Sequence, residues 1–326
     1  MLISSVKAAL GSFLLSILFS LLVTKVSRRG DFLTSKGIPS IGGISMGLAF
    51  FISLLLIGPS VGGLPKEIQG ILIASVVMLI FGIVDDHWEL SVIQKFAVQL
   101  IAASVLVGFD VRTHIVYMGV PWNIAISLLW IVGITNAMNL LDVMDGLAGG
   151  TALVILSGFC AITAMNGNHL TLILSCALGG AVFGFWVYNV PPAKIYMGNS
   201  GSHFLGILFA ALSFITHYAT FENPVALLTP ILLLGFPILD TLFLILMRIR
   251  KGRSAFDKSK DHMALRFLKR GHSKRKTLAM MMGWTLFFVI VGLVLSKVST
   301  HFAILTLVFA GFGSFVLMKK MSCVKI

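Results

Sequence analysis

Residues 68–86 read IQGILIASVVMLIFGIVDD, a run of seventeen uncharged and mostly apolar residues that ends in two adjacent aspartates. An α-helix needs about 20 predominantly apolar residues to cross a bilayer, so this run predicts a membrane helix. Similar runs recur along all 326 residues, of which 57% are hydrophobic and only 11% are charged. Soluble globular domains carry about 25% charged residues, so the composition excludes an ordinary soluble fold. The chain is therefore expected to be an all-α, polytopic integral membrane protein.

Eleven apolar segments are predicted to form a bundle of transmembrane helices. Helices are expected rather than a β-barrel, because lipid offers no partner to unpaired backbone and the segments do not alternate with period two. No polar stretch is long enough to bury a core of its own, so residues 1–326 are expected to form one membrane-embedded domain with a basic loop at 248–278. The predicted segments are 2–24, 41–58, 68–84, 94–109, 121–138, 150–165, 169–188, 202–219, 225–247, 279–296 and 301–318.

The distribution of Lys and Arg predicts the orientation of the bundle. With eleven helices, 21 of the 25 Lys and Arg fall on one side of the membrane, twelve of them between Arg248 and Lys276. Basic loops are retained in the cytoplasm, so the N-terminus is expected outside and the C-terminus inside. The net charge of +13 is then explained by topology and by anionic lipid, and no nucleic-acid partner is expected.

Two adjacent acids, Asp85 and Asp86, follow the apolar run that ends at Val84. At a membrane boundary they repel each other and lose hydration, and a divalent cation relieves both penalties. Mg²⁺ is typically bound by one or two carboxylates together with water and phosphate. A solvated helix end is the alternative interpretation of this pair.

The next cytoplasmic stretch places Asn136, Asn139, Asp142 and Asp145 at intervals of three residues. On a helix they would form one polar strip. Polar residues at membrane depth usually face a cavity and have a function, so the strip is predicted to line a site. A water-exposed helix end remains the alternative.

The stretch Tyr188–Ser202 contains Asn189 and Asn199, and it precedes a predicted helix. Backbone N–H groups at a helix N-terminus can bind phosphate, although an ordinary turn and N-cap would explain the same residues. The three cysteines, Cys160, Cys176 and Cys323, show no metal-ligand spacing and are interpreted as packing residues.

In the basic loop, His262 and Arg266 are four residues apart, so on a helix both could point toward a diphosphate. Contact with anionic lipid is the default explanation for most other cations in this loop. Asp240 lies inside an apolar segment and is expected to have a buried partner.

In this order, the clusters resemble the motifs of the polyprenyl-phosphate N-acetylhexosamine-1-phosphate transferase family, glycosyltransferase family 4. The family includes phospho-N-acetylmuramoyl-pentapeptide transferase and the UDP-N-acetylglucosamine–undecaprenyl-phosphate transferases. The resemblance covers nearly the whole chain. The matching stretches are KGIPSIGG (36–43), Asp85-Asp86 with Leu90-Ser91, NLLDVMDGLA (139–148) and YNVPPAKIYMGNSGSHFLG (188–206).

The resemblance implies an enzyme that transfers an N-acetylhexosamine 1-phosphate from a UDP-sugar to a polyprenyl phosphate, such as undecaprenyl phosphate, and releases UMP. It implies dependence on Mg²⁺, with Mn²⁺ as an alternative. It also implies a place in a bacterial inner membrane and a role in lipid-linked precursor synthesis for the cell wall or a surface polysaccharide. By motif position, the expected catalytic residues are Asp85, Asp86, Asp145 and His262, the substrate-binding residues Lys36, Asn139, Asp142, Asn189 and Arg266, and the metal ligands Asp85, Asp86, Asp145 and Asn199.

The chain departs from the family pattern in three regions. Asn199 stands where the family has Asp, Val143 where it has Gly, and Ala264 and Leu265 where it has two His. The loss of a charge at Asn199 is expected to weaken Mg²⁺ binding unless a neighbouring aspartate compensates. A non-catalytic homologue or a polyprenyl-lipid transporter is the alternative function, which the retained clustered acids disfavour. The sequence leaves the sugar, the lipid length and a homodimer open.

Overall fold

Helices make up most of the computed structural model, which describes residues 2–27, 34–35, 37–58, 63–88, 90–218, 224–257 and 259–324. Within these ranges the only strands are β1 (Thr34–Ser35) and β2 (Ile38–Pro39), which pair antiparallel, and two 3-10 turns lie at Val116–Met118 and Pro224–Leu228. The α-helices are α1 (Leu2–Ser27), α2 (Gly42–Ile57), α3 (Lys66–His87), α4 (Val92–Gly108), α5 (Gly119–Leu141), α6 (Leu147–Met165), α7 (His169–Asn189), α8 (Gly198–Ile215), α9 (Thr229–Leu233), α10 (Gly235–Arg250), α11 (Met263–Lys269), α12 (Lys274–Leu295) and α13 (Thr300–Ser322).

The all-α membrane architecture predicted from the sequence is confirmed. Each of the eleven predicted segments coincides with a helix or, for 225–247, with a bent pair of helices. In the described part of the chain, eight helices are long and apolar enough to cross a membrane, or nine if the bent pair forms one span. Helices α2 and α4 are apolar but only 16 and 17 residues long. The count of eleven spans and the orientation therefore remain predictions.

The segment expected as one helix at 225–247 is bent by 68° where α9 meets α10. Pro237 lies in the first turn of α10 and has no backbone N–H to continue the hydrogen bonds of α9. A proline in this place is a common cause of a sharp change in helix direction.

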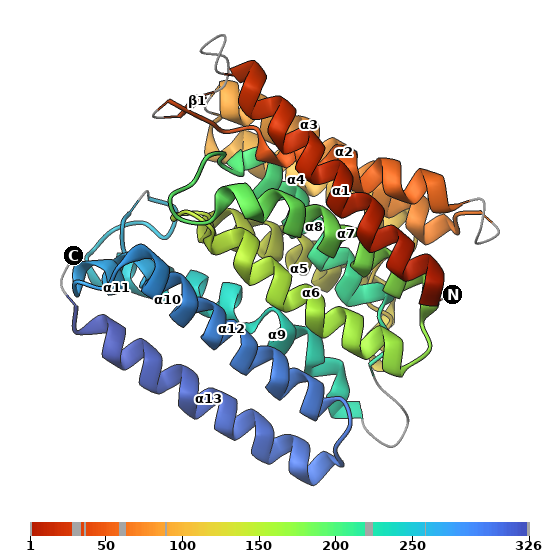
Figure 1. Ribbon diagram of the computed structural model, residues 1–326. Helices are drawn as coiled ribbons and strands as arrows, with labels where there is room; N and C mark the ends of the chain where they lie inside the picture. Colours follow the sequence, from red (N-terminus) through yellow and green to blue (C-terminus); the bar gives the residue numbers. More distant parts are fainter. Residues whose placement is uncertain are drawn as a thin grey trace.

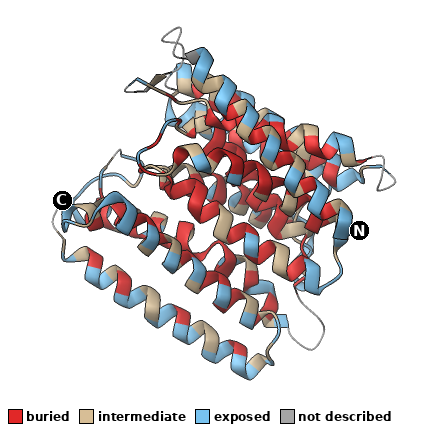
Figure 2. Ribbon diagram, viewed as in Figure 1, coloured by how far each residue is buried: buried red, intermediate tan, exposed pale blue. Residues whose placement is uncertain are grey.

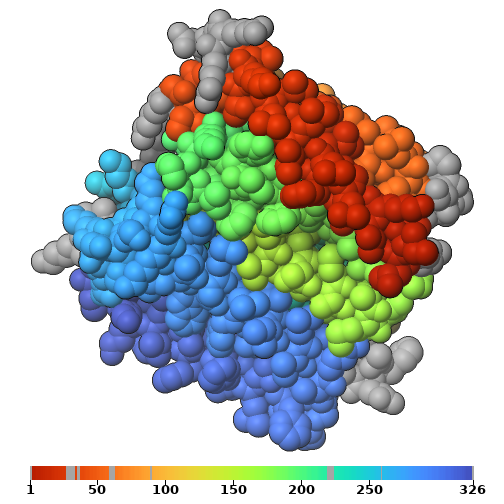
Figure 3. Space-filling view, viewed as in Figure 1, coloured from red at the N-terminus to blue at the C-terminus, as the bar shows by residue number. Residues whose placement is uncertain are grey.

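The bundle has a buried centre and exposed outer helices (Figure 2). Helix α8 is buried along almost its whole length, whereas α13 forms an outer flank and exposes most of its apolar side chains. On the opposite flank α1 packs against α7, where Ser12 and Ser16 donate hydrogen bonds of 2.6 Å to the carbonyls of Ala177 and Ala181. The space-filling view separates these N-terminal and C-terminal flanks, red and blue in Figure 3.

One end of the bundle brings the C-terminal end of α3 against the start of α8. A Cβ atom added at Gly82 would lie 2.2 Å from the Cα atom of Ser200, so only glycine allows this approach. The two ends of the chain lie at opposite ends of the bundle, and α11 lies at the same end as the C-terminus (Figure 1). The close approach of Gly82 to Ser200 brings the Asp85-Asp86 pair next to the start of α8.

Candidate active site

A polar cavity of about 970 Å³ lies at the end of the bundle where α3 ends and α8 begins. Four aspartates from two parts of the chain, two lysines and several amide side chains contribute to its wall. Its lining residues are Thr34, Ser40, Asp85, Asp86, His87, Lys95, Asn139, Asp142, Val143, Met144, Asp145, Asn189, Tyr196, Gly198, Asn199, Leu265, Leu268 and Lys274. All four of the motif stretches identified in the sequence therefore contribute to one cavity.

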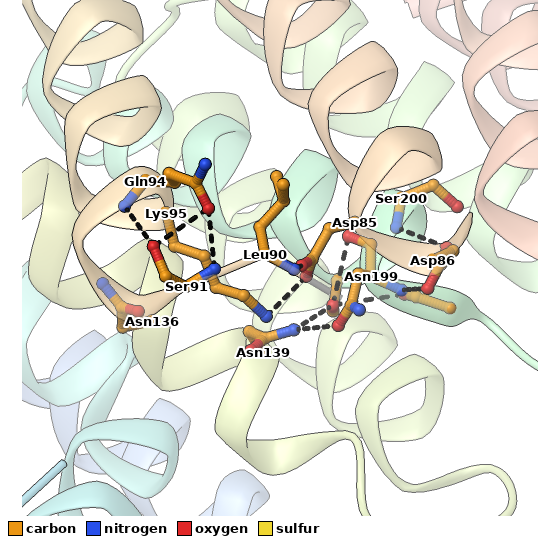
Figure 4. Close-up of polar contacts among 12 residues, drawn as sticks. Asp85, Asp86, Leu90, Ser91, Gln94, Lys95, Asn136, Asn139, Asn199 and Ser200 are labelled. Atoms are coloured by element: carbon orange, nitrogen blue, oxygen red, sulfur yellow. Dashed lines mark hydrogen bonds and ion pairs between the residues drawn. The ribbon is translucent and has the colours of Figure 1, made fainter. Parts of the chain in front are cut away.

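Asp86 binds the start of α8. Its carboxylate accepts hydrogen bonds from the backbone N–H groups of Asn199 at 2.8 Å and Ser200 at 3.2 Å (Figure 4). A negative charge at this position is stabilised by the helix dipole. The backbone N–H groups at the start of α8, which were predicted to bind a phosphate, therefore bind the Asp86 carboxylate of α3.

The side chain of Asn199 points to α5 rather than capping its own helix. Its Oδ1 atom accepts a 2.8 Å hydrogen bond from Asn139, which also donates to Ser202 at 2.9 Å. The N-cap of α8 is Met197, whose own side chain forms no capping hydrogen bond, and the first N–H groups of the helix are bound by Asp86 instead. The alternative that Asn199 is merely an N-cap is therefore wrong.

Asp85 is only 4% exposed and forms a tight ion pair. Its Oδ2 atom lies 2.6 Å from Nζ of Lys95, at the start of α4, and its Oδ1 accepts a 3.0 Å hydrogen bond from the Leu90 N–H (Figure 4). Lys95 neutralises the acid that would otherwise be charged and buried. Sequence analysis had used Lys95 only as a topology signal.

Asp142 and Asp145 lie in the turn between α5 and α6. The sequence predicted one helical strip through Asn136, Asn139, Asp142 and Asp145, but α5 ends at Leu141. Gly146, with a φ of 76°, turns the chain into α6. The turn, not a continuous helix, directs both aspartates to the cavity, and the strip prediction is wrong at these positions.

Charges close to Asp142 change its acidity. Burial, followed by the negative charges of Asp86 and Asp145, raises the pKa of the Asp142 carboxyl to about 7. Asp145 itself lies 2.9 Å from Nζ of Lys274, at the start of α12. Lys274 is a second cavity cation that sequence analysis did not single out, since it is one of many in the basic loop.

Asn189 lines the cavity but uses its amide to hold the backbone. It accepts a 3.0 Å hydrogen bond from the Gly146 N–H and donates one of 2.8 Å to the Ile195 carbonyl. It thereby ties the α5–α6 turn to the loop before α8. Its predicted role in substrate binding stays a prediction, and Lys36 lies outside the described residues.

His262 and Arg266 are not among the residues that line the cavity. His262 lies with Nδ1 3.1 Å from Oδ2 of Asp240, which is the buried partner expected for that acid. Arg266 pairs with Asp261 at 2.6 Å and also donates to the backbone carbonyls of Met321 and Val324. The two side chains do not point together toward a shared ligand as expected, because each is bound by its own aspartate.

Asp261 anchors the basic loop. Burial by itself raises the pKa of its carboxyl, but hydrogen bonds and positive charges from Lys251 and Arg266 outweigh this effect and lower that pKa below its ordinary value. The groups Asp240, Asp261, His262 and Arg266 are called the loop cluster below. Only Leu265 and Leu268 of the neighbouring α11 reach the cavity.

The donor set of the cavity suits a hard divalent cation. Among the described residues, no three His, Cys, Asp or Glu side chains converge closely enough to hold a metal by themselves. Mg²⁺ does not require this, since it is commonly bound by one or two carboxylates with water and substrate phosphates. Carboxylate and amide oxygens are the ligands that Mg²⁺ prefers. The ammonium groups of Lys95 and Lys274, which pair with Asp85 and Asp145, are suited to bind phosphate beside the cation. The residues therefore fit a cation–phosphate complex.

Comparisons with known proteins show the family to which the chain belongs. The family model described as glycosyl transferase family 4 matches residues 68–217, which include both aspartate motifs and the start of α8. A probable undecaprenyl-phosphate N-acetylglucosaminyl 1-phosphate transferase of Bacillus subtilis is 32% identical over an alignment of 288 residues that covers 81% of this chain and 78% of that protein. A decaprenyl-phosphate N-acetylglucosaminephosphotransferase of Mycobacterium tuberculosis is 34% identical over 283 residues, covering 76% of this chain and 69% of the relative.

A third relative shares a shorter region. The phospho-N-acetylmuramoyl-pentapeptide-transferase of Shouchella clausii is 34% identical over an alignment of 203 residues that covers 56% of this chain and 62% of that protein. The helices, the motifs and these similarities lead to one assignment. This chain is a multi-pass membrane protein that belongs to glycosyl transferase family 4.

Proposed function

We propose that the protein transfers an N-acetylhexosamine 1-phosphate from a UDP-sugar to a polyprenyl phosphate such as undecaprenyl phosphate, and releases UMP. The reaction would take place at the cytoplasmic face of a bacterial inner membrane, in lipid-linked precursor synthesis for the cell wall or a surface polysaccharide. The observation that carries the proposal is the aspartate-lined cavity at one end of the helical bundle. The printed activities of the relatives support the same reaction class.

The reaction joins two anionic substrates from different phases. A phosphate oxygen of the lipid attacks the phosphorus that carries the sugar, and the bond from this phosphorus to the oxygen of UMP breaks. The products are UMP and a polyprenyl diphosphate sugar. A soluble nucleotide and a lipid headgroup can meet only at the membrane boundary, which is where polar side chains at helix ends are expected to lie.

The chain's own residues can hold both phosphates. Lys95 and Lys274 carry positive charge into the cavity from α4 and α12. Each lysine would leave its aspartate and pair with a substrate phosphate. This exchange would bind the anionic substrate and release the carboxylates of Asp85 and Asp145. Asp85 would then accept the lipid phosphate proton or orient that phosphate, and Asn139 would remain bound to Asn199 on the nucleotide side.

In this proposal Asp85, Asp86, Asp145 and Asn199 hold Mg²⁺ or Mn²⁺, with Asp142 close to the same charges. The cation supplies neutralisation of the diphosphate charge when it is bound. Diphosphate binding by His262 and Arg266 would require the ion pairs of the loop cluster to open. Asn189 would keep the α5–α6 turn in place.

Purified protein in detergent, supplied with undecaprenyl phosphate and a panel of UDP-sugars, tests the proposal through UMP release. Release is expected with at least one UDP-N-acetylhexosamine, and it should require both the lipid and Mg²⁺. Binding of UDP-sugar without UMP release, under conditions where a related transferase is active, would instead indicate a non-catalytic homologue.

A further inference from the structure

Two amide side chains below the cavity, Gln99 and Asn136, bind each other across α4 and α5. Gln99 Nε2 donates to Asn136 Oδ1 at 3.2 Å, and Asn136 Nδ2 donates back to Gln99 Oε1 at 2.6 Å. Asn136 also donates to the carbonyl of Val132 at 2.8 Å. Gln99 is only 1% exposed. An amide buried at membrane depth is unfavourable unless it has partners, so this pair strongly favours one arrangement of the two helices.

The amide pair lies next to the cavity on both helices. Gln99 follows Lys95 by four residues, and Asn136 precedes Asn139 by three, so each amide is one helical turn from a cavity residue and on the same face. Asn136 itself is not a cavity residue. The pair therefore joins the helix that carries Lys95 to the helix that carries Asn139.

Few directional contacts other than the amide pair and the Lys95 ion pair fix the position of helix α4, which otherwise packs through apolar side chains and an edge-on contact between Phe96 and Phe256. Its buried side chains are Gln99, Ala102, Ala103 and Leu106, of which only Gln99 forms directional contacts. Small apolar residues allow a helix to slide or rotate at little cost, whereas reciprocal hydrogen bonds specify one register. The hydrogen bonds of the Ser91–Gln94 capping box lie within the start of α4, so they order its first turn without fixing the helix against its neighbours.

The position of Lys95 matters because its contact with Asp85 is short and partly buried. The Nζ–Oδ2 distance is 2.6 Å, and the side chain of Lys95 is 27% exposed whereas that of Asp85 is fully buried. A lysine side chain is flexible, and a small shift of its helix would lengthen this contact. Displacement by about 1 Å can reduce turnover by about 100-fold when it misplaces groups at a reaction centre.

We propose that Gln99 and Asn136 are positioning residues for Lys95. Their reciprocal hydrogen bonds hold α4 against α5 in the register at which the Lys95 ammonium meets Asp85. The effect on turnover rests on the proposed transferase function, whereas the effect on Lys95 does not.

Gln99→Leu and Asn136→Leu each remove the reciprocal hydrogen bonds and place an apolar side chain where the amide was. Each variant is expected to lower kcat about 10- to 100-fold while KM for the UDP-sugar stays within about twofold, since Lys95 lies beside Asp85, which is assigned to the lipid phosphate and not to the nucleotide. The double Leu variant should lose no more than either single variant, because both remove the same interaction. The exchanged variant Gln99→Asn with Asn136→Gln keeps the combined side-chain length and should recover most of the lost kcat.

Ser213→Ala is the matched control. It removes another hydrogen bond between helices, in which Trp130 of α5 donates to Ser213 of α8 at 2.7 Å. Trp130 is nine residues from Asn139, about 13 Å along the helix. This variant should unfold at a lower temperature but keep its kcat, which separates loss of positioning from loss of stability.

Acylation of lysines by an amine-reactive ester, followed by peptide mass spectrometry, gives a readout that does not need activity. Lys95 is expected to react several-fold faster in the Leu variants. Lys274, which lies on α12 and pairs with Asp145, should react at the wild-type rate. If the wild type releases no UMP, the proposed function fails while the labelling result still tests the pair. Wild-type labelling of Lys95 in folded Gln99→Leu protein, or equal loss of kcat in Ser213→Ala, would overturn the positioning role. If the Leu variants do not fold, Gln99→Asn and the exchanged variant decide the question by the same two measurements.

Discussion

The cavity and the loop cluster contain the same chemistry, aspartates beside basic side chains, but they use it differently. In the cavity, the acids come from the end of α3 and the α5–α6 turn, and they line a space of about 970 Å³. In the loop cluster, His262 and Arg266 are only 4% and 2% exposed, and each is bound by an aspartate. Arg266 also holds the carbonyls of the C-terminal helix. Ion pairs that line a cavity can exchange a partner for a ligand, whereas buried ion pairs that do not line it stabilise the fold.

Loss of a cavity acid should have the largest effect on turnover. Asp85→Asn removes the charge that faces Lys95, and it is expected to lower the rate of UMP release at least about 100-fold without unfolding the protein. Asp110→Asn is the control, because Asp110 also pairs with a basic residue, Arg112 at 2.8 Å, but lies exposed outside the cavity. Activity of Asp85→Asn within a few-fold of wild type would show that the cavity is not the reaction centre.

The acidity of Asp142 predicts the pH dependence of turnover. Because its pKa is raised to about 7, the carboxyl is neutral below this pH and charged above it. If a charged Asp142 is needed near the cation, UMP release at low Mg²⁺ should fall about tenfold per unit as the pH drops below about 7. The acid limb should disappear in Asp142→Asn. If the acid limb persists unchanged in Asp142→Asn, another titrating group is responsible for the pH dependence.

Asn199 offers a smaller test of the same charges. Asn199→Asp restores the acid of the family pattern while keeping the oxygen that accepts from Asn139. Apparent Mg²⁺ affinity is expected to rise about tenfold, or about 1.4 kcal/mol, because a carboxylate is the stronger ligand for a hard cation. A magnesium titration of both forms measures the change. Superimposable curves would mean that position 199 does not contact the metal.

The loop cluster should show the smallest effect on turnover. Arg266→Leu leaves Asp261 paired with Lys251 alone and removes one of the hydrogen bonds that hold the end of α13. Breaking a buried ion pair destabilises a protein by about 3–5 kcal/mol, so the variant should unfold at a lower temperature. Its turnover per folded molecule is expected to stay within about threefold of wild type. A large loss of kcat with unchanged thermal stability would restore Arg266 as a substrate ligand.

Sequence alone determined the class of fold and the order of the motifs. Apolar runs identify the helices because lipid forces every backbone group to pair within its own segment. The acids at Asp85, Asp86, Asp142 and Asp145 were identified for a related reason, since charges at membrane depth are unfavourable without a function or a partner.

Only the tertiary structure decided which charged residues face one another. Asp86 binds the start of α8, 113 positions later, because Gly82 allows the two backbones to touch. Lys95 reaches Asp85 because α4 is held against α5, and Arg266 is turned toward the C-terminal helix instead of the cavity. Local periodicity cannot encode these pairings, since they depend on where helices end and how closely distant segments approach.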